Sequence, residues 1–210
     1  MTMRQIALTA ALLAIVFLAH AAGRVTQMGG AQFAPSIGIY TLMALLIAPY
    51  TGWGALTGIG LVVGLLTMLA TSSPFPPANI PAHGGGFLLA SALAKATYRG
   101  GCEYNLASML GILAVTVFVS WTLFSGFTWL GLTTSFVGAP NAGFAGASRS
   151  AFGHAIGQGY LAWWIVGFLT VGIPTYVISA ILLPLLYRAV QPALVRQGML
   201  PMPEGAAPGQ

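Results

Sequence analysis

Long apolar segments follow one another along this chain, with short polar connections between them. The first covers residues 5–23, and two more cover residues 36–48 and 53–70. About 20 apolar residues in a helix span the roughly 30 Å of hydrocarbon in a bilayer. Hydrophobic residues make up 57% of the chain and charged residues 4%, and the mean hydropathy is +0.87. Too little polar surface remains to cover a water-soluble globule, so the sequence predicts an all-α integral membrane protein.

Three further apolar segments complete a set of six predicted transmembrane helices, at residues 84–98, 105–132 and 160–187. Pro174 and Pro184 are expected to kink the last one. The segment 36–48 is short, which predicts a tilted or partial span. Residues 133–159, rich in Gly, Ala and Ser, predict a long loop. Residues 1–190 therefore form one predicted six-helix domain, and residues 191–210 a predicted disordered cytoplasmic tail.

The first apolar segment has two interpretations. Arg4, the apolar run and the following Ala19-His20-Ala21-Ala22 are typical of a cleaved signal peptide. However, Ala7 pairs with Ala11 and Ala10 with Ala14 at four-residue spacing, which predicts a face of small side chains for close helix packing. A removed leader has no need of such a face, so a retained helix is favoured.

Glycines and prolines shape the middle of the chain. Gly54 and Gly58, then Gly60 and Gly64, repeat at four-residue spacing and predict close approach by neighbouring helices. Residues 72–83 contain four prolines and are expected to form a braced loop at a membrane surface.

The positive charges predict an orientation. Six spans place both termini on one side, and if that side is the cytoplasm, five of the seven Lys and Arg residues lie inside. The other two, Arg24 and Arg149, lie outside, so the positive-inside rule predicts N-in and C-in. Aromatic residues agree, because each predicted interface carries its own group: Tyr50, Trp53, Tyr98, Tyr104 and Tyr187 inside, and Trp129, Tyr160, Trp163 and Trp164 outside.

Residues for catalysis are scarce. Common nucleotide, metalloprotease and serine-hydrolase motifs are absent, and the only acids are Glu103 and Glu204. His20, His83 and His154 without a carboxylate make a weak metal site. The sequence therefore predicts neither an enzyme nor a metal or cofactor held by this chain.

Two other classes of site are disfavoured by composition. The pI is near 9.8, but the cations are scattered singly and do not form the basic stripe of a nucleic-acid-binding protein. The single cysteine, Cys102, excludes an internal disulfide and a Cys-x-x-Cys metal site.

Three motifs carry a family resemblance. They are the Ala-x-x-x-Ala pairs of the first helix, Ile-Ala-Pro-Tyr-Thr-Gly-Trp-Gly-Ala-Leu-Thr-Gly at residues 47–58, and Pro-Phe-Pro-Pro-Ala-Asn-Ile-Pro at residues 74–81. Over about residues 6–96 the chain resembles the substrate-binding S components of energy-coupling factor (ECF) transporters, and residues 77–81 resemble their tryptophan-transporting branch. The last two helices share only the topology.

The resemblance implies a small six-helix protein in the prokaryotic plasma membrane that captures a nutrient on its outer face. Energy would come from a T component and two ATPase subunits that use ATP. The first-helix alanines would form the face that packs on the T component: Ala7, Ala10, Ala11 and Ala14.

The outward charges narrow the predicted ligand. No acidic residue faces outward in the predicted topology, so a cationic ligand would lack a counter-ion and a neutral or anionic one is favoured. Arg24 and Arg149 are the available partners for a carboxylate, although both could be solvated loop charges. An aromatic amino acid such as tryptophan, or a vitamin or vitamin precursor, is the predicted ligand. The candidate substrate-binding residues are Arg24, Asn79, His83, Trp129, Asn141, Arg149, His154 and Trp163.

Two other functional classes stay open. A structural or accessory subunit of a larger membrane complex would share the glycine faces and the sparse chemistry, but would bind no ligand of its own. A membrane enzyme acting on a lipid or quinone would have to rely on the three histidines.

Overall fold

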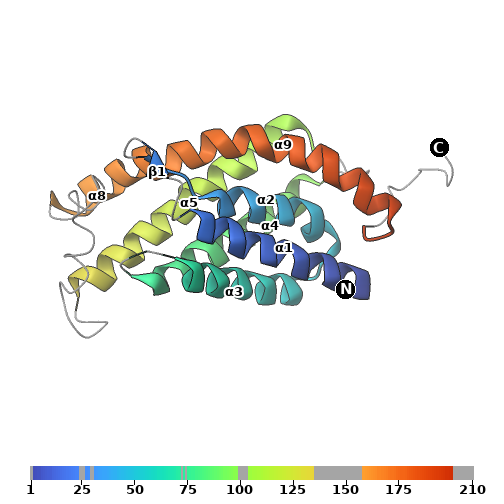
Figure 1. The fold of residues 1–210 in the computed structure, drawn as a ribbon, viewed down its shortest axis with the longest axis horizontal. Helices are drawn as coiled ribbons and strands as arrows, with labels where there is room; N and C mark the ends of the chain where they lie inside the picture. The colour runs from blue at the N-terminus through green and yellow to red at the C-terminus, as the bar shows by residue number, and fades with distance from the viewer. Residues whose placement is uncertain are drawn as a thin grey trace.

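Helices contain most of the described residues in the computed structural model (Figure 1). The structure describes residues 2–23, 27–28, 31–71, 73, 75–98, 104–134 and 158–200. Its α-helices are α1 (Met3–Ala22), α2 (Pro35–Ile47), α3 (Trp53–Ala70), α4 (Gly85–Thr97), α5 (Leu106–Thr133), α8 (Tyr160–Gly167) and α9 (Ile173–Arg196). Two 3-10 turns, η1 (Ala48–Tyr50) and η2 (Pro76–Ala78), and two π-helical turns, η3 (Ile80–Gly84) and η6 (Phe168–Gly172), join them. β1 (Gln27–Met28) pairs antiparallel with β2 (Ala31–Gln32).

Four helices are long and apolar enough to cross a membrane. These are α1, α3, α5 and the continuous helix of α8, η6 and α9. The segment Pro35–Tyr50 is also apolar and helical but shorter. The predicted all-helical class is therefore confirmed for the described residues, and the four long apolar helices suggest a membrane-embedded protein. The count of six crossings stays a prediction.

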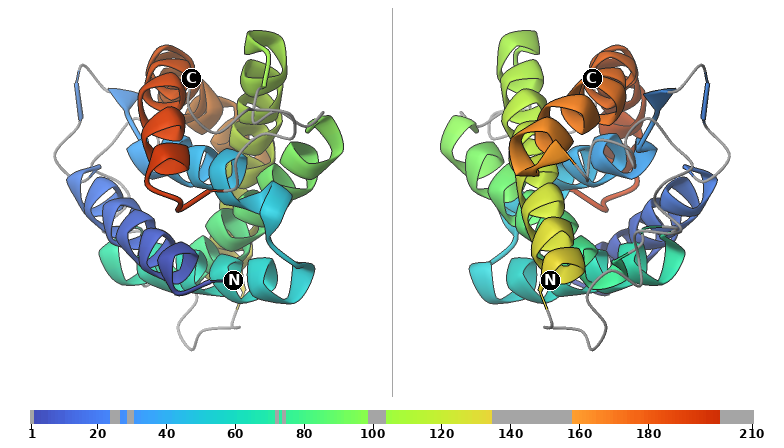
Figure 2. Two further views of the ribbon diagram at one scale, coloured as in Figure 1. Left: turned by 90° about the vertical axis from the view of Figure 1, so that its right-hand side faces the viewer. Right: turned by 90° about the vertical axis from the view of Figure 1, so that its left-hand side faces the viewer.

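α2 lies at the centre of the bundle, with α1, α4, α5 and α9 packed around it (Figure 2). Ten of its 13 residues are buried, on every side of the helix. A helix that is apolar all round is one that neighbouring helices enclose. This explains the short segment at residues 36–48, because a helix sheathed in protein need not match the thickness of the bilayer.

Local sequence signals set where the helices begin. Thr2 and Gln5 form a capping box at the start of α1, in which the Gln5 N–H donates to Thr2 Oγ1 at 3.3 Å. Pro35 occupies the first turn of α2, where its missing N–H costs nothing. Asn105 caps α5, with its side-chain oxygen accepting from the Ser108 N–H at 2.7 Å.

The Pro-rich segment is more helical and more buried than predicted. Residues 76–78 form η2 and residues 80–84 form η3, which continues directly into α4. Pro76, Pro77 and Pro81 lie in first turns, where the helix does not require their N–H groups. The braced loop expected over residues 72–83 is therefore wrong for residues 76–83, which are helical; residues 72 and 74 lie outside the described residues.

Among the described residues, one of the two predicted glycine pairs packs against a neighbouring helix and the other does not. A Cβ on Gly60 would lie 3.2 Å from the carbonyl oxygen of Gly84, and one on Gly84 would lie 2.7 Å from that of Gly60. Backbone therefore meets backbone between α3 and η3. Gly54 and Gly58 have no atom within 4 Å of a built Cβ among the described residues.

The C-terminal helix extends past its predicted end. α9 continues to Arg196, Leu194 and Leu200 are buried, and Arg4 Nη1 donates to the Gln197 carbonyl oxygen at 3.3 Å. Residues 191–200 are therefore ordered by packing, and the predicted disordered tail does not apply to them; residues 201–210 lie outside the described residues. The start of α1 and the end of α9 lie at the same end of the bundle (Figure 1).

Aromatic groups occupy both ends of α5. Near its start, the Tyr50 and Tyr98 hydroxyls are 2.7 Å apart, and the Tyr104 ring contacts the rings of Tyr98 and Tyr187. Near its end, Trp129 contacts Tyr160 with ring centroids 6.0 Å apart. Tyr104 and Trp129 are separated by about 37 Å at 1.5 Å per helical residue, a distance that fits opposite interfaces of a bilayer.

Candidate functional site

Four of the eight predicted substrate-binding residues lie in the described structure. Asn79 and His83 come from the segment that leads into α4, while Trp129 lies on α5 and Trp163 on α8. The others lie outside the described residues: Arg24, Asn141, Arg149 and His154.

His83 forms the centre of a buried cluster of rings. It is 6% exposed, on η3. The His20 ring, at the end of α1, meets it edge to face with centroids 4.8 Å apart. The Tyr40 ring of α2 meets it in the same manner at 5.8 Å. Three elements distant in sequence therefore place aromatic side chains around one histidine.

Two hydrogen bonds fix the neighbours of His83. His20 Nδ1 lies 2.9 Å from Ser36 Oγ, which joins the end of α1 to the start of α2. The Tyr40 hydroxyl lies 2.7 Å from Ser120 Oγ, which joins α2 to α5. Gly86 makes the second bond possible, because a Cβ there would contact Ser120 Oγ and lie 2.7 Å from the Tyr40 hydroxyl.

Four buried polar atoms have no hydrogen-bond partner within the described part of the chain. They are His83 Nδ1, Ser91 Oγ, Thr116 Oγ1 and Thr128 Oγ1. All four belong to η3, α4 or α5. Among them, only His83 belongs to the ring cluster, and its Nδ1 is a buried polar atom of a kind that is usually hydrogen-bonded.

Asn79 has a local structural role. Its Nδ2 donates to the Pro76 carbonyl oxygen at 2.9 Å, and the residue is 1% exposed. The neighbouring Phe75 and Ala78 pack with Leu132 and Trp163 in a second hydrophobic cluster. Asn79 therefore braces the turn that holds this cluster in place.

Indole N–H groups join α8 to α5. Trp163 Nε1 donates to the Ser125 carbonyl oxygen at 3.3 Å, and Trp164 Nε1 to Thr122 Oγ1 at 3.2 Å. Trp163 is fully buried, and the partly buried Trp129 packs against the same cluster. Both residues form an aromatic wall beside Asn79 rather than beside the His83 rings.

The predicted partner face on α1 points away from the bundle. Leu8, Thr9, Leu12 and Val16 are buried on one side of the helix. The alanines on the other side are exposed, and they are Ala7, Ala10, Ala11 and Ala14.

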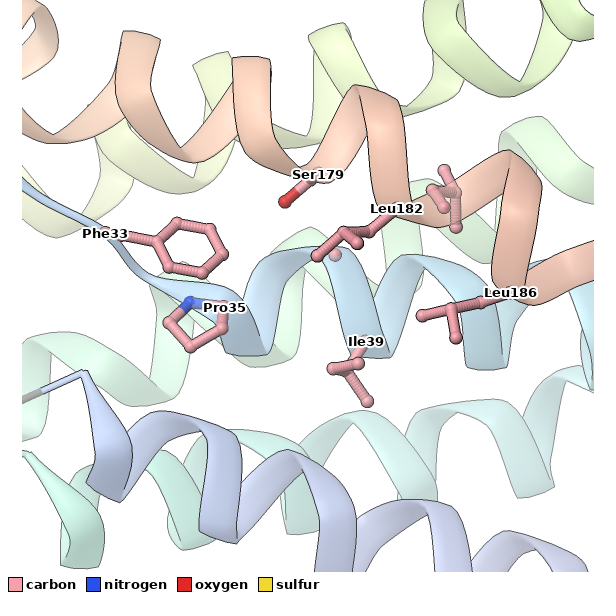
Figure 3. Close-up of a pocket in the computed structure, with 8 residues that line it drawn as sticks. Phe33, Pro35, Ile39, Ser179, Leu182 and Leu186 are labelled. Atoms are coloured by element: carbon pink, nitrogen blue, oxygen red, sulfur yellow. The ribbon is translucent and has the colours of Figure 1, made fainter. Parts of the chain in front are cut away.

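A small apolar cavity lies between α2 and α9 (Figure 3). Its volume is about 40 Å³, and its walls include Phe33, Ile39, Leu182 and Leu186, with the Ser179 hydroxyl as a polar group. A nutrient pocket is several hundred Å³ in volume and carries several polar groups, so this cavity is too small for the predicted ligand.

The sequence singled out His83 but missed three of its companions. Ser36, Tyr40 and Ser120 each lie in an apolar helix. A polar side chain within such a helix is itself a signal of a functional or packing role, and it could have identified them. Of the three histidines considered for an enzyme or metal, two are in contact and His154 lies outside the described residues. Within the described ranges, no group of three or more His, Cys, Asp or Glu side chains could hold a metal ion.

Comparison with protein-family models, with curated proteins and with solved structures gives no match.

Proposed function

We propose that this protein is the membrane-embedded substrate-binding subunit, or S component, of an ECF-type importer. The observation that carries the proposal is the exposed small-residue face of α1, formed by Ala7, Ala10, Ala11 and Ala14. It matches the face that the family resemblance assigns to packing on a T component.

The contrast with the outward faces of α9 and of the C-terminal half of α3 supports a protein partner at this position. The C-terminal half of α3 exposes Leu61, Leu65 and Leu69, whereas its first turns expose Gly54 and Gly58. α9 exposes a row of large side chains: Val177, Ile181 and Leu185. Large side chains suit contact with lipid, whereas small ones let another helix approach closely. On α1 the alanines lie between the exposed Ile6 and Ile15, and the exposed Met3 and Leu18 mark the two ends of this small-residue stripe.

The proposed topology has six crossings with both termini in the cytoplasm. α2 and the combined η3–α4 helix would add two crossings to the four long helices. Arg4, Arg188 and Arg196 belong to the end of the bundle where α1 begins and α9 ends, as does the tyrosine group. Cations and tyrosines at one end fit the cytoplasmic interface of a multi-pass protein in a prokaryotic plasma membrane.

The proposed ligand is a small neutral or anionic nutrient taken from the outer face. The described residues contain no acidic side chain, so they offer no counter-ion for a cationic ligand. An aromatic amino acid such as tryptophan, or a vitamin or its precursor, fits the aromatic residues near the outer end. In this proposal Arg24 or Arg149 holds a ligand carboxylate, and Asn141 and His154 complete the outer site. The transport energy comes from ATP used by the two partner ATPases.

Ligand binding tests this function. The purified full-length protein should be heated with each of the 20 amino acids and the water-soluble vitamins, and any compound that raises its unfolding temperature should then be measured by calorimetry. At least one compound should bind with a micromolar or lower Kd. If none binds, the protein is better explained as an accessory subunit, which would use the same α1 face without a ligand.

A further inference from the structure

His83 occupies a buried position in which one of its two ring nitrogens lacks a hydrogen-bond partner among the described residues. Its ring is buried at 6% exposure, and Nδ1 has no hydrogen-bond partner within the described residues. Buried polar atoms in native proteins almost always have a partner, so an unpaired one needs a specific explanation.

The packing around η3 prevents His83 from moving away. Gly64 of α3 lies against the Ile80 backbone at the start of η3, and Gly60 lies against Gly84 at its end. Contacts between backbones cannot adjust as side chains can. The imidazole is therefore presented at a fixed place and angle.

The neighbouring polar groups are engaged elsewhere. His20 Nδ1 is bonded to Ser36, and the Tyr40 hydroxyl is bonded to Ser120. Both side chains contact His83 through their rings and not through these polar atoms. The surroundings of His83 are thus aromatic and already hydrogen-bonded.

Among the described residues, these surroundings carry no formal charge. His20, Ser36, Tyr40 and Ser120 supply neutral side chains when the imidazole is neutral. A charged ligand group placed there would be buried without compensation, whereas a neutral ring nitrogen would not. Aromatic edges and faces favour a flat ring.

We propose that His83 determines ligand specificity by hydrogen bonding an uncharged ring N–H of a planar nitrogen heterocycle. A neutral imidazole accepts at Nδ1 when Nε2 carries the proton. Any carboxylate of the ligand lies away from this group. The inference rests on the proposed function, because it names the part of the ligand that the site recognises.

Matched ligand pairs test it. The affinities of the full-length protein for L-tryptophan and 1-methyl-L-tryptophan, and for riboflavin and 3-methylriboflavin, should be measured by calorimetry. Within each pair a methyl group replaces the hydrogen of the ring N–H, which removes the donor and adds one carbon. For the pair that binds, the wild-type protein should prefer the N–H compound roughly tenfold or more, as expected for a buried hydrogen bond.

Variants assign the preference to His83. His83→Phe keeps the ring packing and should bind both members of the pair equally. His83→Asn places an amide near the Nδ1 position and should keep part of the preference. Ser91→Ala removes another unpaired buried group from α4 and should leave the preference unchanged.

Two contrary outcomes are distinguishable. If one pair binds but His83→Phe retains the full preference, the assignment of His83 is overturned while the transport proposal stands. If neither pair binds but another nutrient of the full panel does, and His83→Phe leaves its affinity unchanged, the assignment is also overturned. If no compound of the panel binds the wild-type protein, the proposed function fails, and this inference fails with it.

Discussion

Gly64 of α3 and Ile80 of η3 lie backbone against backbone, so a Cβ on Gly64 would be 2.8 Å from the Ile80 carbonyl oxygen. Gly64→Ala should therefore force the two helices apart and lower the free energy of unfolding by about 1 to 3 kcal/mol. Gly58→Ala is the matched control on the same helix. No described atom lies within 4 Å of a Cβ at Gly58, so alanine there should be neutral or stabilise by up to about 1 kcal/mol.

The measurement is thermal or denaturant unfolding of the two variants in the same detergent. Equal stabilities of Gly64→Ala and Gly58→Ala would show that the α3–η3 contact has room for a methyl group and is not a close backbone contact.

A bulky residue on the outward face of α1 should block the proposed partner. Ala11→Trp should weaken co-purification with a co-expressed T component from the same genome, because overpacking a helix interface costs about 1 to 3 kcal/mol. Ligand affinity and unfolding temperature should change little, since Ala11 is exposed. Ala114→Trp is the control, at an exposed position on α5, a helix that packs mainly on α4, η3 and α9. Undiminished association of Ala11→Trp would remove this face from the proposed interface.

Cysteine labelling should establish the orientation. In a Cys102→Ser background, a cysteine at the exposed Pro77 should react with an impermeant thiol reagent applied to intact cells. One at the exposed Gln197, beside Arg4, should react only after the cells are opened. Asn79 lies in the same segment but is 1% exposed and would label poorly in either orientation. The reverse pattern of labelling would place the N-terminus outside.

The proposed carboxylate partner should be revealed by charge removal. Replacing the correct arginine, Arg24→Ala or Arg149→Ala, should cost about 2 to 5 kcal/mol of binding free energy, or roughly 30-fold or more in Kd, by leaving the ligand carboxylate unpaired. Arg188→Ala, an exposed cation on α9, should have no effect. Parental affinity in both outward variants, or a cationic ligand, would refute the electrostatic part of the proposal.

The helices were predictable because each corresponds to one continuous apolar segment with its own start and stop signals. Residues 53–70 were predicted as one helix and are α3, bounded by Gly52 and Thr71. The errors lie where local signals conflict with packing. Four prolines suggested a braced surface loop over residues 72–83, yet contact with Gly60 and Gly64 holds most of that segment in helical turns. Likewise, polar residues after Gln191 suggested disorder, while Leu194 and Leu200 are buried.

The site was only partly predictable. His83 stood out as a histidine beside three glycines, and the sequence identified it as a candidate. Its contacts with His20 and Tyr40 depend on how α1, α2 and η3 pack, and no spacing in the chain encodes a distance between residues 20 and 83. Trp163 was predicted to lie near the ligand by type and position, but its burial and its bond to Ser125 come from the pairing of α8 with α5.

α2 becomes fully enclosed only late in the synthesis of the chain. One wall around α2 is supplied by α9, which the ribosome produces about 130 residues after α2. Until then, the side of α2 that α9 will cover, including the position of Gly38 against Ser179, has no permanent neighbour. The central helix is therefore made well before this part of its surroundings exists, and chains that stop short of α9 should be recognised and removed by cellular quality control.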